Sequence, residues 1–310
     1  MALSYDQLSA ITKKHYVPKL IDNVFDSDPL LQRLKKKDRY QKISGGTSVM
    51  FPLSYALTTS AGWYTGAETL QTTDNNQITA AEYDWKQLYV NISIERSEEL
   101  KNMGDAQVVD LVKAKTQIAE DTLVDYLGDG LYSDGTTNTK SIVGTRLLVV
   151  ASGSTVGGIS TTDNSWWRSS VDSTTTTLGL GAMQTRYNAV TINNKSPTVG
   201  LATRTIFNSY WGLLQPQQRF TDGDTAKGGF QNLMFNGMPI IAGSKVSSSQ
   251  PLLFLNEQHL CLKVHKDEDM RFEPFQKPVN QNVKTAKIYW MGAFGTDNMR
   301  MHASFTALTA

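Results

Sequence analysis

The sequence predicts an α+β fold, and three observations lead to this prediction. Residues 47–53 and 82–94 show the two-residue alternation of β-strands and enclose a long polar segment. A pattern with helical period follows over residues 105–127. Between residues 141 and 250 short strand and helix patterns alternate, and strand patterns resume after them. An α/β domain is therefore expected to be inserted into a framework of sheet and one long helix.

The composition is that of a folded protein with a large core. The chain has 310 residues, of which 40% are hydrophobic and 19% charged. Its longest apolar run, residues 147–151, is far too short to cross a bilayer, and the first residues lack the continuous apolar stretch of a secretory signal. The single cysteine, Cys261, cannot form an internal disulfide. These features argue against a membrane-spanning or fibrous protein and fit a reducing cytoplasm.

Charge is unevenly distributed along the chain, although the net charge is only +1. Residues 1–42 carry 9 basic and 5 acidic side chains, whereas residues 43–140 carry 6 basic and 14 acidic ones. Complementary charge of this kind favours head-to-tail contact between copies of the chain. Solvated faces of opposite sign would produce the same pattern, so both interpretations stay open.

Residues 1–43 predict an extended N-terminal arm with a helical turn or two. Pro18 and Pro29 separate its short apolar clusters, and a segment with so few apolar residues must lie along another surface. The lysines near its end could touch phosphate, but a lone triplet is more typical of a solvated face. The candidate arm-contact residues are Lys35, Lys36, Lys37 and Arg39.

Residues 44–95 predict a long β-hairpin, in which Val49, Phe51 and Leu53 share one face of the first strand. In the second strand the apolar face switches between Trp85 and Leu88. Because side chains alternate strictly along a strand, the switch indicates either a bulge or two halves that pack on different surfaces.

Two aromatic pairs lie in segments whose composition predicts loops. Trp63 and Tyr64 lie between the hairpin strands, in a stretch rich in Thr, Gly and Asn, and loops of this length are generally functional. Trp166 and Trp167, followed by Arg168, lie in a run of Gly, Ser, Thr and Asp. Something must cover such large rings, either a second subunit or the chain itself, so all five residues are candidates for a subunit interface.

The helix predicted over residues 105–127 begins at Asp105, a favourable N-cap, and is expected to stop at Gly128. One stripe of the helix is apolar and is expected to face the core. The residues of this stripe are Val108, Leu111, Val112, Ile118, Ala119, Leu123, Tyr126 and Leu127. The other face is expected to be acidic, through Asp110, Glu120, Asp121 and Asp125.

Further along the chain, shorter elements alternate with loops. A short strand is expected at residues 146–150, an amphipathic helix at 178–190, a strand at 197–201 and a helix at 204–214. After residue 250, two strand-rich stretches and a last strand near 299–308 return to sheet.

The sequence shows no recognisable catalytic or cofactor site. His259, Cys261 and His265 come nearest to a metal-ligand spacing, but a fourth ligand is missing. No glycine-rich run has the phosphate-binding or dinucleotide-binding pattern. Neither an enzyme nor a dedicated nucleic-acid-binding protein is indicated, and no metal or cofactor is expected.

Several motifs resemble, in their order, those of the major capsid proteins of tailed bacteriophages, which share the Hong Kong 97-type capsid fold. The motifs are TVGGISTTDNSWWRSSVD (155–172), YWGLLQPQQRFTD (210–222), GGFQNLMFNGMPI (228–240), LLFLNEQHLCLKVH (252–265) and KIYWMGAFGTDNMRMHA (287–303). The resemblance implies an N-terminal arm at 1–43 and an extended loop at 44–95. It also implies a peripheral domain at 96–140 and 251–310 with the spine helix at 105–127, and an axial domain at 141–250.

The same resemblance implies a shell protein that assembles with itself into pentamers and hexamers of an icosahedral virion around double-stranded DNA. It would be assembled in the host bacterial cytoplasm, with a portal, a separate scaffolding protein and, in some members, a decoration protein. DNA would be packaged without sequence-specific contact, and no membrane is involved. The Met-Ala start favours a separate scaffold over a fused one that is removed.

One departure from the family pattern is chemical. Some members join their extended loops covalently through a lysine, but residues 44–85 contain no lysine, so no such crosslink is expected. Two other functions stay open at this stage: a nanocompartment shell of the same fold, and a secreted or surface β-rich binding module that uses its exposed aromatic rings.

Overall fold

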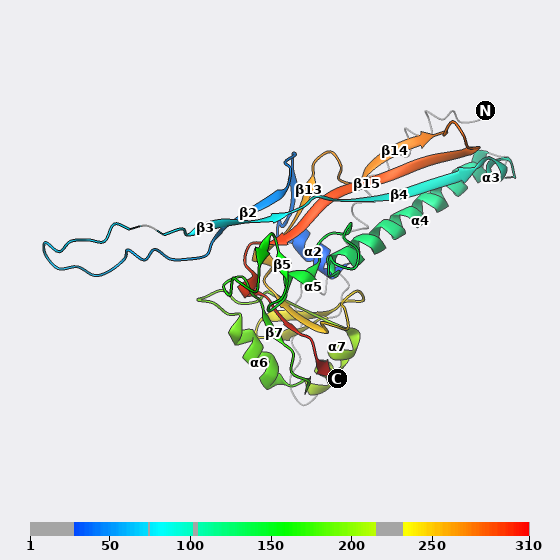
Figure 1. The fold of residues 1–310 in the computed structure, drawn as a ribbon. Coiled ribbons are helices and arrows are strands. Elements are labelled where there is room, and N and C mark those ends of the chain that lie inside the picture. The colour runs from blue at the N-terminus through cyan, green and yellow to red at the C-terminus, as the bar shows by residue number, and fades with distance from the viewer. Residues whose placement is uncertain (1–27, 74, 102–104, 215–231, 310) are drawn as a thin grey trace.

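The structure is a computed structural model, and it describes residues 28–73, 75–101, 105–214 and 232–309. Most of the predicted N-terminal arm and the second resembling motif therefore lie outside the described residues. Figure 1 shows three parts: a long sheet beside a long helix, a more compact unit beside them, and a loop that projects far from both.

The described end of the predicted arm is packed against the rest of the chain. Helix α2 (Pro29–Lys36) begins at Asp28, whose side chain accepts hydrogen bonds from the Leu30 and Leu31 amides. Leu30, Leu31 and Leu34 are fully buried. Strand β1 (Tyr40–Ile43) then pairs in parallel with β13 (Leu260–His265). Residues 28–43 therefore form a short helix and a strand that lie along the rest of the chain, as expected for a segment with few apolar residues.

The long sheet is organised around β15 (Val283–Thr296), its longest strand. Along one side, β15 pairs with β13 and with β14 (Arg271–Gln276), and along the other side it pairs with β4 (Lys86–Glu95). Among the described residues no strand pairs with the second edge of β4. Strand β4 is therefore an edge strand.

The apolar switch near residue 85 marks a break between two strands. Strand β3 (Ile78–Tyr83) pairs with β2 (Val49–Ser54), whereas β4 pairs with β15. Of the two interpretations of this switch, the second is therefore confirmed: the two halves of the predicted strand pack on different surfaces. The buried face of β2 also matches the prediction, because Val49, Phe51 and Leu53 are all buried.

The long helix is present but extends beyond its predicted end. After the short α3 (Arg96–Lys101), helix α4 (Asp105–Leu131) continues through Gly128 and Gly130. A Cβ atom on Gly130 would lie 2.8 Å from Cγ1 of Ile142, so glycine is needed there for close packing and does not end the helix. The expectation of a helix end at Gly128 was wrong.

The predicted apolar stripe of α4 is only partly correct. Val112, Ala119, Leu123 and Leu127 are buried, and the side chains of Val108 and Leu111 lie outside the described ones. Ile118 and Tyr126, however, are 64% and 61% exposed.

The stretch from residue 145 to 177 contains short elements. Helix α5 (Thr145–Leu148) stands where a strand was expected, and its Leu148 is fully buried. Strands β5 (Thr155–Val156) and β6 (Ile159–Ser160) form a tight hairpin. Its two turn residues, Gly157 and Gly158, both have positive φ, which glycine adopts without strain. Strands β7 (Ser170–Asp172) and β8 (Thr176–Thr177) follow.

A second sheet and two helices form the more compact unit. The sheet has the order β10-β11-β9-β12-β16-β7. Helices α6 (Leu180–Ala189) and α7 (Arg204–Leu213) and the strand between them are close to the predicted ranges. One face of the sheet forms a core with α6 and α7, whereas the other face packs in the same core as the long sheet, through Val199, Leu201, Ile241, Leu253 and Leu255. The sheet strands not yet given are β9 (Val199–Ala202), β10 (Asn232–Phe235), β11 (Met238–Ala242), β12 (Leu252–Leu255) and β16 (Ala303–Phe305).

The last predicted strand is broken up. A single turn of 3-10 helix, η2 (Met299–Met301), precedes β16, and β17 (Leu308–Thr309) pairs in parallel with β8. Another such turn, η1 (Glu257–His259), connects β12 with β13 and so links the two sheets.

Candidate subunit interface

The tip of the loop between β2 and β3 presents large apolar side chains to solvent. Trp63 is fully exposed and Tyr64 is 64% exposed, while Leu57 and Leu70 are exposed as well. Figure 1 shows the loop extending away from both sheets. Exposed apolar groups clustered on a projecting segment are typical of a surface that another molecule covers.

The base of this loop is held to the body of the chain. The Tyr55 amide donates to the Gln77 carbonyl at 3.0 Å, and the Thr59 amide donates to Asn75 Oδ1 at 3.2 Å. The Tyr55 ring stacks on Trp166, with 4.9 Å between ring centroids. The loop is therefore anchored at its base, while its tip has no such packing.

Trp166 and Trp167 are covered by their own chain. Trp167 is 2% exposed, and its Nε1 donates to the Val156 carbonyl at 3.0 Å. Trp166 is half-buried between Tyr55 and Trp167. The prediction that Trp167 lies at a subunit interface is corrected, because its ring is already inside the core.

The hairpin that precedes this pair packs on the base of the loop. A Cβ atom on Gly157 would come within 2.8 Å of Ala81 Cβ, and the Glu82 amide donates to the Gly157 carbonyl at 2.9 Å. Only glycine allows the two backbones to approach so closely. The Gly-rich composition around the tryptophans is thus explained by packing within the subunit.

Arg168 also makes contacts within its own segment. Its Nε donates to the Thr161 carbonyl at 2.5 Å and its Nη2 to the Thr162 carbonyl at 2.6 Å. These bonds close the turn that leads to the tryptophan pair. Arg168 remains partly exposed, so part of its surface is available to a neighbour.

The basic residues at the end of α2 lie at the surface. Lys35, Lys36 and Lys37 are exposed, and Arg39 is half-buried next to β13. Nearby, Arg33 is held by the buried carboxylate of Glu257, with Arg33 Nη2 2.9 Å from Glu257 Oε2. The described basic side chains thus lie at one end of a helix that is itself firmly attached.

The acidic face of α4 is smaller than predicted. Glu120 is 5% exposed and belongs to the buried side of the helix, which corrects its assignment to this face. Asp121 and Asp125 are exposed, as expected, whereas the side chain of Asp110 lies outside the described ones. Lys245 forms an ion pair with Asp125 and another with Asp129, at 2.7 Å from Asp129 Oδ1. Part of the negative charge is therefore neutralised.

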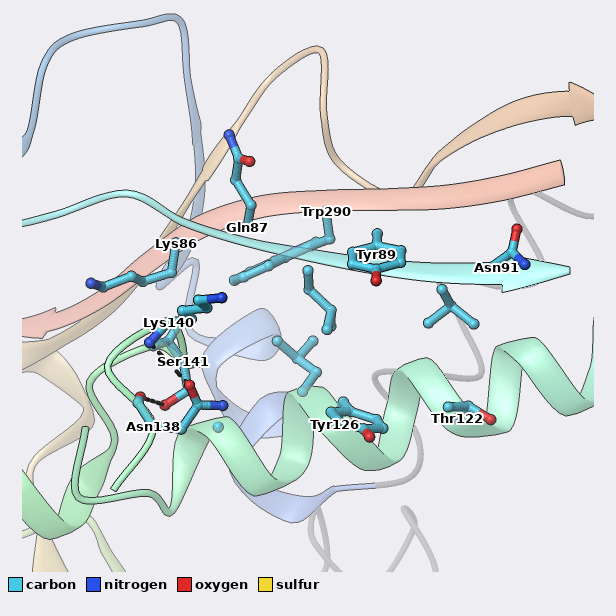
Figure 2. A pocket seen from close by; sticks show the side chains of 15 residues that line it. Lys86, Gln87, Tyr89, Asn91, Thr122, Tyr126, Asn138, Lys140, Ser141 and Trp290 are labelled. Carbon is cyan, nitrogen blue, oxygen red and sulfur yellow. Dashed lines mark hydrogen bonds between the residues drawn. The ribbon is translucent and has the colours of Figure 1, made fainter. Parts of the chain in front are cut away.

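A cleft of about 410 Å³ lies between β4 and the second half of α4 (Figure 2). Lys86 and Lys140 are the charged side chains among its described lining residues, and Lys86 Nζ donates to the Thr139 carbonyl at 2.9 Å. The apolar lining residues are Leu88, Val90, Tyr126, Leu127, Ile142 and Trp290. The sequence did not predict this cleft, because it joins segments from three separate regions. Tyr126 has the helical position of a core residue, so the sequence carried no signal that its ring is exposed there.

His302 and His259 make polar contacts within their own chain. His302 is fully buried; its Nδ1 accepts from the Asn256 amide at 3.3 Å, and its Nε2 is 3.0 Å from Thr296 Oγ1. Burial, with a smaller contribution from His259, lowers the pKa of His302 to about 3, so it is neutral. His259 Nδ1 is 2.6 Å from Asp297 Oδ1. In the described ranges no cluster of three or more His, Cys, Asp or Glu could hold a metal ion.

Comparisons with known proteins address the fold. No protein-family model matches the chain, and no curated protein matches it either. Among solved structures, the capsid of cyanophage A-1(L) is similar with a TM-score of 0.69 and 16% identity, over 88% of this chain and 91% of that one. The chain has the major capsid protein fold of tailed phages.

Other capsids with this fold match over nearly the whole length. A Mycobacterium phage Bobi chain is similar with a TM-score of 0.58 and 11% identity, over 100% of this chain and 100% of that one. The satellite phage P4 procapsid, whose structure includes a size determination protein, has a TM-score of 0.52 at 12% identity, over 98% of this chain and 96% of that one. In the part of the chain that the structure describes, no helix combines the length and apolarity needed to span a bilayer.

Proposed function

We propose that this chain is a major capsid protein that assembles into the pentamers and hexamers of an icosahedral shell enclosing double-stranded DNA. The observation that carries the proposal is the capsid fold across 88% or more of the chain, combined with an anchored loop whose apolar tip is exposed. A single subunit leaves that tip in water, whereas a shell covers it with a neighbour. The role is structural, and the proposal includes no enzymatic activity.

The domain boundaries expected from the resemblance are part of this proposal. Residues 1–43 would be the N-terminal arm, 44–95 the extended loop, and 141–250 the axial domain; residues 96–140 and 251–310 would form the peripheral domain. The core formed by α6, α7 and one face of the second sheet supports an axial domain, although strands β12 and β16 of that sheet come from residues 251–310. Because Leu30, Leu31 and Leu34 are buried and β1 pairs with β13, residues 28–43 would be the attached end of this arm.

The proposed contacts between subunits follow from exposure. Trp63 and Tyr64 would dock on a neighbour, and the exposed lysines of α2 would meet an acidic surface of another copy. Trp166 and Arg168 would contribute only their exposed parts, next to the base of the loop. Because each copy both offers and receives such contacts around a ring, the interfaces are heterologous.

The proposed partners and location follow from the proposed capsid function. Assembly would take place in the host bacterial cytoplasm with a separate scaffolding protein and a portal, and a decoration protein is a further candidate. The shell would contact DNA without reading its sequence, and no membrane would be involved. If the exposed Asp121 and Asp125 face the interior, they would repel packaged DNA.

Expression of the chain with and without a scaffolding protein, followed by measurement of particle mass and negative-stain electron microscopy, tests the proposal. Closed shells, or rings of five and six subunits, are the expected result. A well-folded monomer under every condition would overturn it. Nucleic acid content of shells isolated from infected cells separates a genome shell from a nanocompartment of the same fold.

The acidic face is tested separately. Asp121→Asn with Asp125→Asn removes two exposed negative charges, and Lys245 keeps Asp129 as its partner. If these charges face the interior, the variant should assemble normally but package or eject DNA differently from the original chain. Unchanged packaging and ejection would remove this role.

A further inference from the structure

We propose that the cleft between β4 and α4 receives Trp63 from the extended loop of a neighbouring copy. This inference rests on the proposed shell function and names the surface that the loop tip would contact.

The cleft suits an aromatic side chain. Its volume of about 410 Å³ lies within the roughly 300–1,000 Å³ of typical binding pockets. Tyr126 from α4 and Trp290 from β15 lie on two sides of it (Figure 2), and Leu88 of β4 is a further lining residue. The Tyr126 ring is 61% exposed and is available for the edge and face contacts that aromatic pairs favour, whereas Trp290 is 2% exposed and contributes mainly to the buried lining.

The strand beside the cleft is also open. Strand β4 pairs only with β15 among the described residues, and an edge strand can bind an extended segment from another chain. The loop tip supplies such a segment, because residues 61–65 contain neither helix nor strand. Backbone pairing and insertion of a side chain could thus occur together.

The loop of the same subunit cannot fill this cleft. Figure 1 shows the tip far from α4 and β4, on the other side of β2 and β3. Tyr55, stacked on Trp166, holds the base of the loop in that direction. If this loop fills the cleft, it must therefore be the loop of a second copy.

Charge favours this occupant. Residues 44–85 contain no lysine or arginine but do contain Glu68, near the tip. The charged residues among the described lining of the cleft are Lys86 and Lys140. Asp125 and Asp129, on the adjacent part of α4, are paired with Lys245. An acidic loop thus meets a basic rim.

Disulfide trapping in the full-length chain tests the proposal. In a Cys261→Ser background, Thr65→Cys places a thiol two residues from Trp63. It is combined with a second cysteine at one of three positions that line the cleft from α4 or from residues 138–141: Thr122→Cys, Asn138→Cys or Ser141→Cys. The matched control combines Thr65→Cys with Ser249→Cys, an exposed position outside the lining of the cleft. Mild oxidation and non-reducing gels are applied to assembled particles.

We expect covalent multimers with at least one cleft position, reversed by reductant and well above the control. If shells form but no cleft position exceeds the control, the inference is wrong and the shell function stands. If neither the original chain nor any variant assembles with or without a scaffold, the proposed function fails, and the inference fails with it.

Discussion

Arg33 and Glu257 form a buried ion pair between residues 224 positions apart in the chain. Their side chains are 13% and 1% exposed, and Glu257 Oε2 also accepts from Thr198 Oγ1 at 2.8 Å. The pair joins α2 to the turn that links the two sheets. We expect Glu257→Gln to lower the free energy of unfolding by about 3–5 kcal/mol, because it leaves the Arg33 cation without its countercharge.

Denaturant unfolding measures this loss. Glu268→Gln is the matched control, since Glu268 pairs with Arg271 at the surface and exposed pairs contribute about 1 kcal/mol or less. Equal effects of the two substitutions would contradict the structural role assigned to Glu257.

Trp63→Ala should leave the stability of the subunit unchanged to within about 0.5 kcal/mol, because the ring contributes no buried surface. Under the proposed function it should nevertheless reduce the yield of assembled particles. Thermal unfolding of the subunit and sedimentation of the assembled fraction measure the two effects. Normal assembly of the variant would rule out a docking role for Trp63.

Trp167→Ala should behave in the opposite way. The ring is 2% exposed and its Nε1 is bonded to Val156, so removing it should cost about 3–5 kcal/mol of subunit stability. Unfolding of the isolated subunit shows the loss before any assembly. A variant as stable as the original chain would mean that this segment is not packed as described.

Acid should weaken the fold through His302. Its pKa is about 3 in the folded state and 6.5 for an unperturbed histidine, so only the unfolded chain takes up this proton between those values. Stability should therefore fall as pH decreases from about 6.5, by up to about 1.4 kcal/mol per pH unit from this residue. His302→Gln should show a shallower dependence on pH, whatever its stability at pH 7. An identical slope would mean that His302 titrates normally.

The assembled shell should contain no covalent links through its extended loop. Residues 44–85 have no lysine to supply the nitrogen of an isopeptide bond. Denaturing gels of mature particles should show a single band at the mass of the subunit. A ladder of multimers that survives reducing agent would contradict this expectation.

The sequence predicted well those features that depend on local geometry. The alternation of Val49, Phe51 and Leu53, the long helix over residues 105–127 and the break near residue 85 all appear in the structure. Each depends on the period of a strand or helix, which neighbouring residues determine. The prediction of a strand at residues 146–150 was wrong, because a short apolar run is compatible with a buried helix as well as with a strand.

Residues of the candidate interface were harder to predict. Trp63 and Trp167 both lie in polar, glycine-containing segments, yet one is fully exposed and the other is buried. Glu120 was expected at the surface of α4 and Tyr126 in the core, but Glu120 is buried and the Tyr126 ring is exposed. The cleft beside Tyr126 depends on where β4, α4 and residues 138–142 meet.

The sequence alone determined the class of fold, the order of most of its elements and the presence of aromatic side chains in loops. Only the tertiary structure decided which of those rings is covered, where α4 ends against Ile142, and which surface is left open beside β4. The reason is physical. Periodicity follows from the backbone geometry of consecutive residues, whereas burial depends on contacts between segments far apart in the chain, which no local pattern records.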